Sequence, residues 1–186
     1  MITAQDAAKH LLKLKKAEES FKGFVQLHNP EWKLPDFHKT LITALDRLEG
    51  GEGPRNLLIT MPPRHGKSTF GSVYFPAYFM ARKPSRYIMS TSYNSQLATD
   101  FGRQVRDLVN DPLTRQAYPD LEMSQDSRAV DQWRTTVGGA AYFIGVGGTT
   151  TGRAANILLL DDPLKSREEA ESATQRNKVW DFYVSG

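Results

Sequence analysis

The chain has 186 residues, of which 39% are apolar and 24% charged, and it contains no cysteine. These proportions exclude a disordered chain, and the lack of cysteine excludes disulfides and thiolate metal sites. The net charge of +3 is too small to identify a polyanionic partner. The longest strongly apolar stretch, residues 73–81, has about half the length of a membrane-spanning helix, and the first residues lack a signal-peptide pattern. We therefore expect an intracellular protein with no membrane partner.

The first part of the sequence has the periodicity of helices. A capping box and apolar residues at helical spacing predict a helix over residues 3–20. A second helix is predicted from residue 36 or 37 until the glycine-rich break at 50–54. We interpret residues 1–55 as an N-terminal helical segment that leads into a core formed by residues 56–186.

From residue 56 onward, short apolar runs alternate with helical patterns. Apolar runs predict buried strands at 57–61, 87–91 and 157–160, and helical patterns predict helices at 67–82 and 95–110. Strands that alternate with helices predict an α/β fold with a mostly parallel sheet flanked by helices.

The remaining segments carry weaker signals. Residues 111–132 are interpreted as loop-rich, and two β-prone runs around the glycines at 138 and 139 predict a hairpin over 133–144. A capping box formed by Ser166 and Glu169 predicts a terminal helix toward Trp180.

The strongest motif follows the first apolar run, where residues 61–68 read Met-Pro-Pro-Arg-His-Gly-Lys-Ser. The phosphate-loop pattern requires a glycine, four residues and then Gly-Lys-Ser/Thr, between a strand and a helix. The end of the motif fits, while Met61 stands where the first glycine is expected. Backbone N–H groups at the start of the next helix still favour a phosphate. The expected nucleotide-binding residues are Pro63, Arg64, His65, Gly66, Lys67, Ser68 and Thr69.

Side chains of this loop have different expected roles. Lys67 is expected to reach the β- and γ-phosphates and Ser68 to bind Mg²⁺. Arg64 lies inside the loop and is expected to contact phosphate. His65 is expected to shape the turn, because phosphoryl transfer depends on positioning and charge stabilisation. The other interpretation is a chance Gly-Lys-Ser in a proline-rich turn.

Two carboxylates, Asp161 and Asp162, directly follow the last apolar run. Open α/β sheets place their ligand sites at the carboxyl ends of the strands. We expect Asp161 to bind the same metal ion as Ser68, directly or through water. Asp162 stands where many such ATPases carry a glutamate that orients the attacking water. The other interpretation is an acidic loop after a buried strand.

Arg153 is a further candidate because it ends the glycine- and threonine-rich segment 147–153, just before the acid-bearing run. Either Arg64 or Arg153 could act as an arginine finger, in cis or from a neighbouring subunit. The alternative for Arg153 is a surface or backbone-capping role. Trp32, Phe37 and His38 also allow two interpretations, adenine contact or core packing, and their residue types favour packing.

With these motifs, the sequence resembles the N-terminal ATPase region of the large subunit of tailed-bacteriophage terminases, the DNA-packaging motors. The resemblance spans roughly residues 20–184 and is most specific at residues 57–68 and 152–163. The loop Pro-Pro-Arg-His-Gly-Lys-Ser is characteristic of this family, so Met61 agrees with the resemblance.

The resemblance implies a P-loop NTPase fold of the ASCE type and a Mg²⁺-dependent ATP hydrolase that drives double-stranded DNA into the procapsid. By position, Lys67 and Ser68 match the family's phosphate-loop pair, and Asp161 matches its metal-binding acid. Asp162 matches the water-activating acid, although many relatives have glutamate there, and Arg153 lies near a trans-acting arginine of some relatives. The implied cofactors are ATP and Mg²⁺. The implied partners are double-stranded DNA, the portal protein, the small terminase subunit and further copies in a ring, in the host cytoplasm.

Members of that family continue with a coupling motif on another strand, a lid and an RNase H-like nuclease domain. We therefore expect a truncated core, without the endonuclease of the parent protein. In the family's sheet order, the absent strand lies between the strand at 57–61 and the strand that carries Asp161. Two alternatives stay open: a non-catalytic remnant that binds nucleotide or DNA, and a helicase-like nucleic-acid ATPase.

Overall fold

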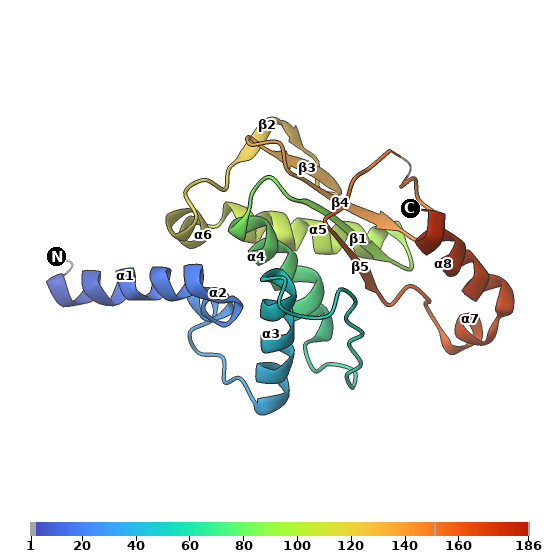
Figure 1. The fold of residues 1–186 in the computed structure, drawn as a ribbon, viewed down its shortest axis with the longest axis horizontal. Helices are drawn as coiled ribbons and strands as arrows, with labels where there is room; N and C mark the ends of the chain where they lie inside the picture. Colours follow the sequence, from blue (N-terminus) through green and yellow to red (C-terminus); the bar gives the residue numbers. More distant parts are fainter. Residues whose placement is uncertain (1–2, 151, 186) are drawn as a thin grey trace.

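The computed structural model describes residues 3–150 and 152–185, so Met1, Ile2, Gly186 and Thr151 of segment 147–153 lie outside the described residues. The fold is α/β, with a five-stranded mixed sheet in the order β2-β3-β4-β1-β5 packed against helices (Figure 1). Within the described ranges, every helix is too short or too polar to traverse a lipid bilayer.

The N-terminal segment forms α1 (Ala4–Glu19), α2 (Phe21–His28) and α3 (Asp36–Glu49). The capping box between Thr3 and Asp6 starts α1, as predicted. Ser20 ends α1 in an extended conformation, and its hydroxyl then accepts a hydrogen bond from Gly23 N–H at the start of α2. Helix α2 was not predicted from the sequence as a separate helix. These helices share one hydrophobic core with the sheet, while the start of α1 projects from the body (Figure 1).

The packing of α1 on α2 depends on Gly23, because a Cβ there would lie 1.8 Å from the Lys16 carbonyl oxygen. We expect Gly23→Ala to destabilise the fold by about 2 kcal/mol or more, since the two helix backbones would have to separate. Urea unfolding measures this change. The matched control is Gly71→Ala, a helical glycine with no atom within 4 Å of an added Cβ. A control that loses as much stability as Gly23→Ala would contradict the explanation.

The strand predicted at 57–61 is wrong. These residues run without regular structure and belong to no sheet among the described strands. Leu58 is 89% exposed, in conflict with a strand buried on both faces. A β-strand needs a partner for its ladder hydrogen bonds, and no described strand lies alongside to supply them.

The helix predicted at 67–82 is present but is not uniformly α-helical. A π-helical segment, η1 (Thr69–Tyr74), continues directly into α4 (Phe75–Arg82). Pro76 has no N–H to donate to the carbonyl group four residues earlier, so regular α-helical bonding cannot run through this point. Short π-helical segments within helices frequently lie at functional sites.

The sheet is formed by β1 (Tyr87–Ser92), β2 (Met123–Arg128), β3 (Gln132–Thr135), β4 (Ala140–Gly145) and β5 (Ile157–Asp161). Central β1 pairs in parallel with β4 and β5, whereas β3 pairs antiparallel with β4 and β2. Among the described strands, two pairings are parallel and two antiparallel, so the sheet is mixed and the expectation of a mostly parallel sheet is met only in part. The short hairpin that joins β3 to β4 imposes antiparallel pairing, because parallel strands need a long crossover.

The other helices are α5 (Ser95–Asn110), α6 (Pro112–Ala117), α7 (Arg167–Glu171) and α8 (Ala173–Ser185). The prediction for α5 is confirmed, and the predicted terminal helix is divided at Ser172 into α7 and α8. The interpretation of 111–132 as loop-rich was wrong, because this segment contains α6 and β2. Asp111 caps α6 by accepting from Leu113 N–H, a local signal that the sequence analysis did not use.

Helices cover the sheet face that carries Ser92, Phe143 and Asp161. A Cβ on Gly102 of α5 would lie 2.8 Å from the Phe143 ring, so α5 packs directly on this face. The strand register places Ser92, Gly145 and Asp161 side by side where parallel strands β1, β4 and β5 end. The helix that follows loop 62–66 packs on the same face, because Ser72 contacts Asp161.

Candidate functional site

Loop 62–66 has a constrained conformation. Arg64 and Gly66 adopt positive φ angles of 63° and 82°. The His65 ring donates from Nδ1 to the Pro63 carbonyl oxygen at 2.8 Å. His38 of α3 donates from Nε2 to the His65 carbonyl oxygen, also at 2.8 Å. His65 therefore shapes the turn, as expected, and His38 fastens the turn to α3, which the sequence did not indicate.

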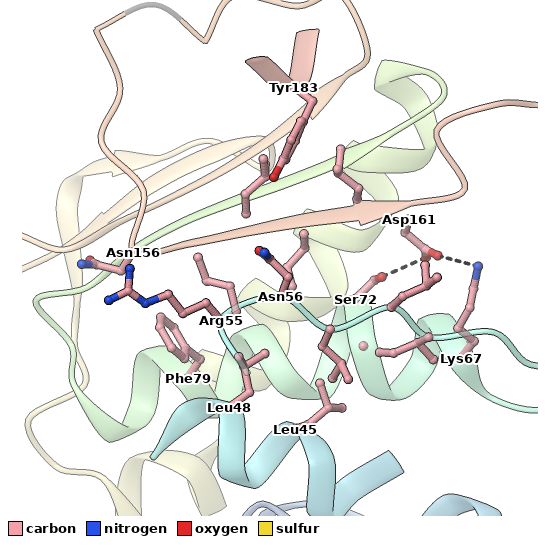
Figure 2. Close-up of a pocket in the computed structure, with 18 residues that line it drawn as sticks. Leu45, Leu48, Arg55, Asn56, Lys67, Ser72, Phe79, Asn156, Asp161 and Tyr183 are labelled. Carbon is pink, nitrogen blue, oxygen red and sulfur yellow. Dashed lines mark hydrogen bonds and ion pairs between the residues drawn. The ribbon is translucent and has the colours of Figure 1, made fainter. Parts of the chain in front are cut away.

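Lys67 links this loop to both acids after β5. Its Nζ lies 3.1 Å from Asp161 Oδ1 (Figure 2). The same Nζ also contacts Asp162 Oδ1. The Asp161 side chain is only 8% exposed, whereas that of Asp162 is 64% exposed. The cluster thus contains one cation and two carboxylates, of which one is buried and one faces solvent.

The charge of Lys67 is stabilised by these carboxylates. Burial by itself would lower the pKa of Lys67, but hydrogen bonds and ion pairs with Asp162 and Asp161 outweigh this and raise the pKa. The amino group therefore stays protonated at neutral pH and is available to an anionic ligand that competes with the two carboxylates.

Ser72 is a site residue that the sequence analysis missed. Its hydroxyl donates to Asp161 Oδ2 at 2.8 Å, from the π-helical segment η1 (Figure 2). Ser68, the predicted metal ligand, lies four residues earlier, next to Lys67 in the first turn. Ser72 could have been identified from its spacing to Ser68, because residues four positions apart in a helix lie near one face, and this helix is otherwise mostly apolar.

Backbone strain is concentrated in the same two segments. Among residues 3–150 and 152–185, the non-glycine residues with positive φ are Arg64 (63°) and Asp162 (44°). Such conformations persist only where the surrounding structure enforces them, and they cluster at functional sites. Both residues were selected from the sequence for their chemistry, so their strain is an independent observation about the same site.

The structure does not bring Arg153 into this cluster. Its guanidinium lies 4.7 Å above the Tyr142 ring. By register, Tyr142 is on the sheet face opposite to that of Asp161. Arg64 lies in the loop with an exposed side chain. A finger role for Arg153 within one chain would require it to leave Tyr142.

The aromatic residues before the loop pack against the helix that follows it. Trp32 makes edge contacts with Phe70 and Tyr74 at centroid distances of 6.0 and 5.7 Å. The His38 ring lies 4.6 Å from that of Phe70. Trp32 and His38 therefore make the packing contacts that their residue types favour. Phe37, next to them, remains 45% exposed.

A cavity of about 500 Å³ separates the segment before the loop from β5 (Figure 2). It is lined by the consecutive residues 55–59 on one side and 156–161 on the other. Because successive side chains of an extended segment point to opposite sides, two walls made of consecutive residues face the cavity with their backbone edges as well as with side chains. Tyr183 of α8 and Phe79 of α4 contribute to other walls. In the part of the chain that the structure describes, no strand pairs with this edge of β5.

The residues present fit a magnesium ion that is shared with phosphates. Within the described residues, no group of three or more histidine or acidic side chains forms a metal site of its own. Magnesium ordinarily uses one or two carboxylates together with substrate phosphates and water. A buried carboxylate, Asp161, close to the start of a helix that carries Ser68, matches this donor set.

Comparison of the chain with protein-family models, curated proteins and solved structures finds no match. What the structure establishes is an α/β fold with a mixed sheet, in which a strained, glycine-containing turn delivers a lysine to two acids at the end of a parallel strand.

Proposed function

We propose that the chain binds Mg²⁺–ATP at residues 63–69 and belongs to the class of phosphate-loop ATPases. The contact of Lys67 with Asp161 and Asp162 is the observation that carries this proposal. The contact joins a loop before a helix to acids at the carboxyl end of a parallel strand. Ligands of open α/β sheets bind at this edge.

Each residue has a definite task in this proposal. Lys67 moves from the acids to the β- and γ-phosphates, and the first N–H groups of its helix hold phosphate oxygens. Ser68 and Asp161 hold Mg²⁺, and Ser72 orients the Asp161 carboxylate. The metal would neutralise charge that develops on the phosphates. The exposed Asp162 orients water, and Arg64 stabilises charge on the transferred group.

The finer proposal is that this ATPase powers DNA packaging as part of a terminase large subunit. Its support is the resemblance of residues 57–68 and 152–163 to that family. The partners would be double-stranded DNA, the portal protein, the small terminase subunit and further copies in a ring, in the host cytoplasm. In such a ring, Arg153 or Arg64 could act on the nucleotide of a neighbouring copy.

The cavity between residues 55–59 and β5 favours a second candidate function, nucleotide binding without sustained turnover. Catalytic groups need rigid support, and the segment before the loop has no ladder hydrogen bonds to a described strand. Phosphate binding needs only the loop and the helix start, whereas hydrolysis also needs a fixed distance from the γ-phosphate to Asp162.

Titration with a fluorescent ATP analogue, with Mg²⁺ and with EDTA, tests the binding proposal, and multiple-turnover phosphate release separates the two candidates. We expect the unmodified chain to bind the analogue in a Mg²⁺-dependent manner. The variant Asp162→Asn should retain this affinity within about threefold, because Asn also tolerates the positive φ of this position and the proposed metal ligands do not include Asp162. Any turnover should fall by about 100-fold or more in that variant. Binding without turnover by the unmodified chain supports the second candidate, and absence of binding contradicts both.

A further inference from the structure

Two serines of the central strand have buried hydroxyls with no hydrogen-bond partner. Ser90 and Ser92 of β1 are both fully buried, and within the described residues neither Oγ has a partner. Most buried hydroxyls are hydrogen-bonded, because an unpaired one carries a desolvation penalty. Such a hydroxyl is of interest where it lies beside a candidate site.

Ser92 is placed beside the candidate site, and Ser90 is not. In the parallel ladder, Ser92 pairs with Asp161 and Ser90 pairs with Leu159. Paired residues on neighbouring strands, which lie about 4.8 Å apart, point their side chains to the same face. The Ser92 side chain thus lies next to that of Asp161 on one face of the sheet, while Ser90 lies one pleat away from Asp161.

Asp161 has two donors in the structure, and nucleotide binding would remove one of them. Ser72 donates to Oδ2, and Lys67 contacts Oδ1. If Lys67 turns to the phosphates, as the proposed function requires, Oδ1 loses its cation. A buried carboxylate needs its oxygens satisfied and held in one orientation to bind a metal. A free hydroxyl on the adjacent strand can replace the lost donor.

We propose that Ser92 is a positioning residue that donates to Asp161 when Lys67 binds phosphate, and so fixes the carboxylate for Mg²⁺. The inference rests on the proposed function and adds a residue to the site. It also explains why β1 keeps a buried hydroxyl without a partner at this position: the partner is available only in the nucleotide-bound state.

The proposal predicts opposite effects on the free and the bound protein. In Ser92→Ala, the melting temperature of the free chain should stay the same or rise, because the hydroxyl lost has no partner. The Mg²⁺ concentration for half-maximal binding of the fluorescent ATP analogue should rise about tenfold or more, the value of one hydrogen bond to a charged group. Binding measured in EDTA should not change, because Ser92 acts through the metal ligand.

Ser90→Ala is the matched control, since it removes an equally buried, equally unpartnered hydroxyl from the same strand and the same face. Its Mg²⁺ dependence should equal that of the unmodified chain. An unchanged Mg²⁺ dependence in Ser92→Ala, or an equal rise in Ser90→Ala, overturns the proposal while leaving the proposed function intact. Absence of Mg²⁺–ATP binding by the unmodified chain overturns the proposed function and this inference with it.

Discussion

Lys67→Ala is expected to weaken ATP binding by about 30- to 150-fold, equivalent to about 2–3 kcal/mol for lost charge-assisted hydrogen bonds. The free protein should also lose stability, because the buried Asp161 carboxyl group, 8% exposed, would lose its cationic partner. Fluorescence titration and urea unfolding measure the two effects separately. Unchanged ATP affinity would show that the loop does not bind phosphate through this residue.

The control for truncation of an ion-paired lysine is Lys39→Ala. Lys39 contacts Asp36 at 2.8 Å, but both side chains are well exposed. Exposed pairs contribute about 0–1 kcal/mol, so we expect little change in stability or binding. The double variant Lys67→Ala/Asp161→Asn adds a sharper comparison. Its stability should recover, because no unpaired buried charge remains, whereas its ATP affinity should not recover.

The Lys67–Asp161 contact illustrates what the sequence could predict. Lys67 and Ser68 begin a helix directly after Gly66, and Asp161 ends an apolar run, so α/β topology places the helix start and the acid at one edge of the sheet. That prediction needs only local patterns and a general rule of sheet topology. The boundaries of β1, α5 and β5 were predictable for the same reason, since each has a strong period or a continuous apolar run.

The failures involve partners that a local pattern does not specify. Residues 57–61 are as apolar as a buried strand, yet they pair with no described strand, and only three-dimensional placement reveals this. The hydrogen bond of His38 to the loop joins residues 27 positions apart, and that of Ser72 to Asp161 joins residues 89 apart. The spacing of Ser68 and Ser72 marks Ser72 as a polar position of its helix, but no sequence pattern identifies the partner in either hydrogen bond. Long-range side-chain pairing therefore depends on the three-dimensional fold and is not encoded in a local pattern.

Gly66→Ala is expected to have the second large effect, because the loop depends on a conformation that alanine resists. Gly66 has φ of 82°, and an added Cβ would lie 3.2 Å from both His38 Nε2 and Phe70 Cε2. The left-handed conformation costs an L-residue about 1–2 kcal/mol, and here the neighbours also have to move. Because His38 holds the His65 carbonyl, its displacement would release the turn that presents Lys67. We expect ATP affinity to fall about tenfold or more.

Gly51→Ala separates backbone strain from the role of the loop. Gly51 has a similar φ of 72°, but no atom lies within 4 Å of an added Cβ. Both variants should lose stability in urea unfolding, because both force alanine into the left-handed region. Only Gly66→Ala should also lose binding in the fluorescence titration. If the two variants bind ATP with equal affinity, the proposal is contradicted in its use of this loop conformation. Alanine at residue 66 cannot adopt the conformation without strain, so nucleotide would then have to bind a different conformation of the loop.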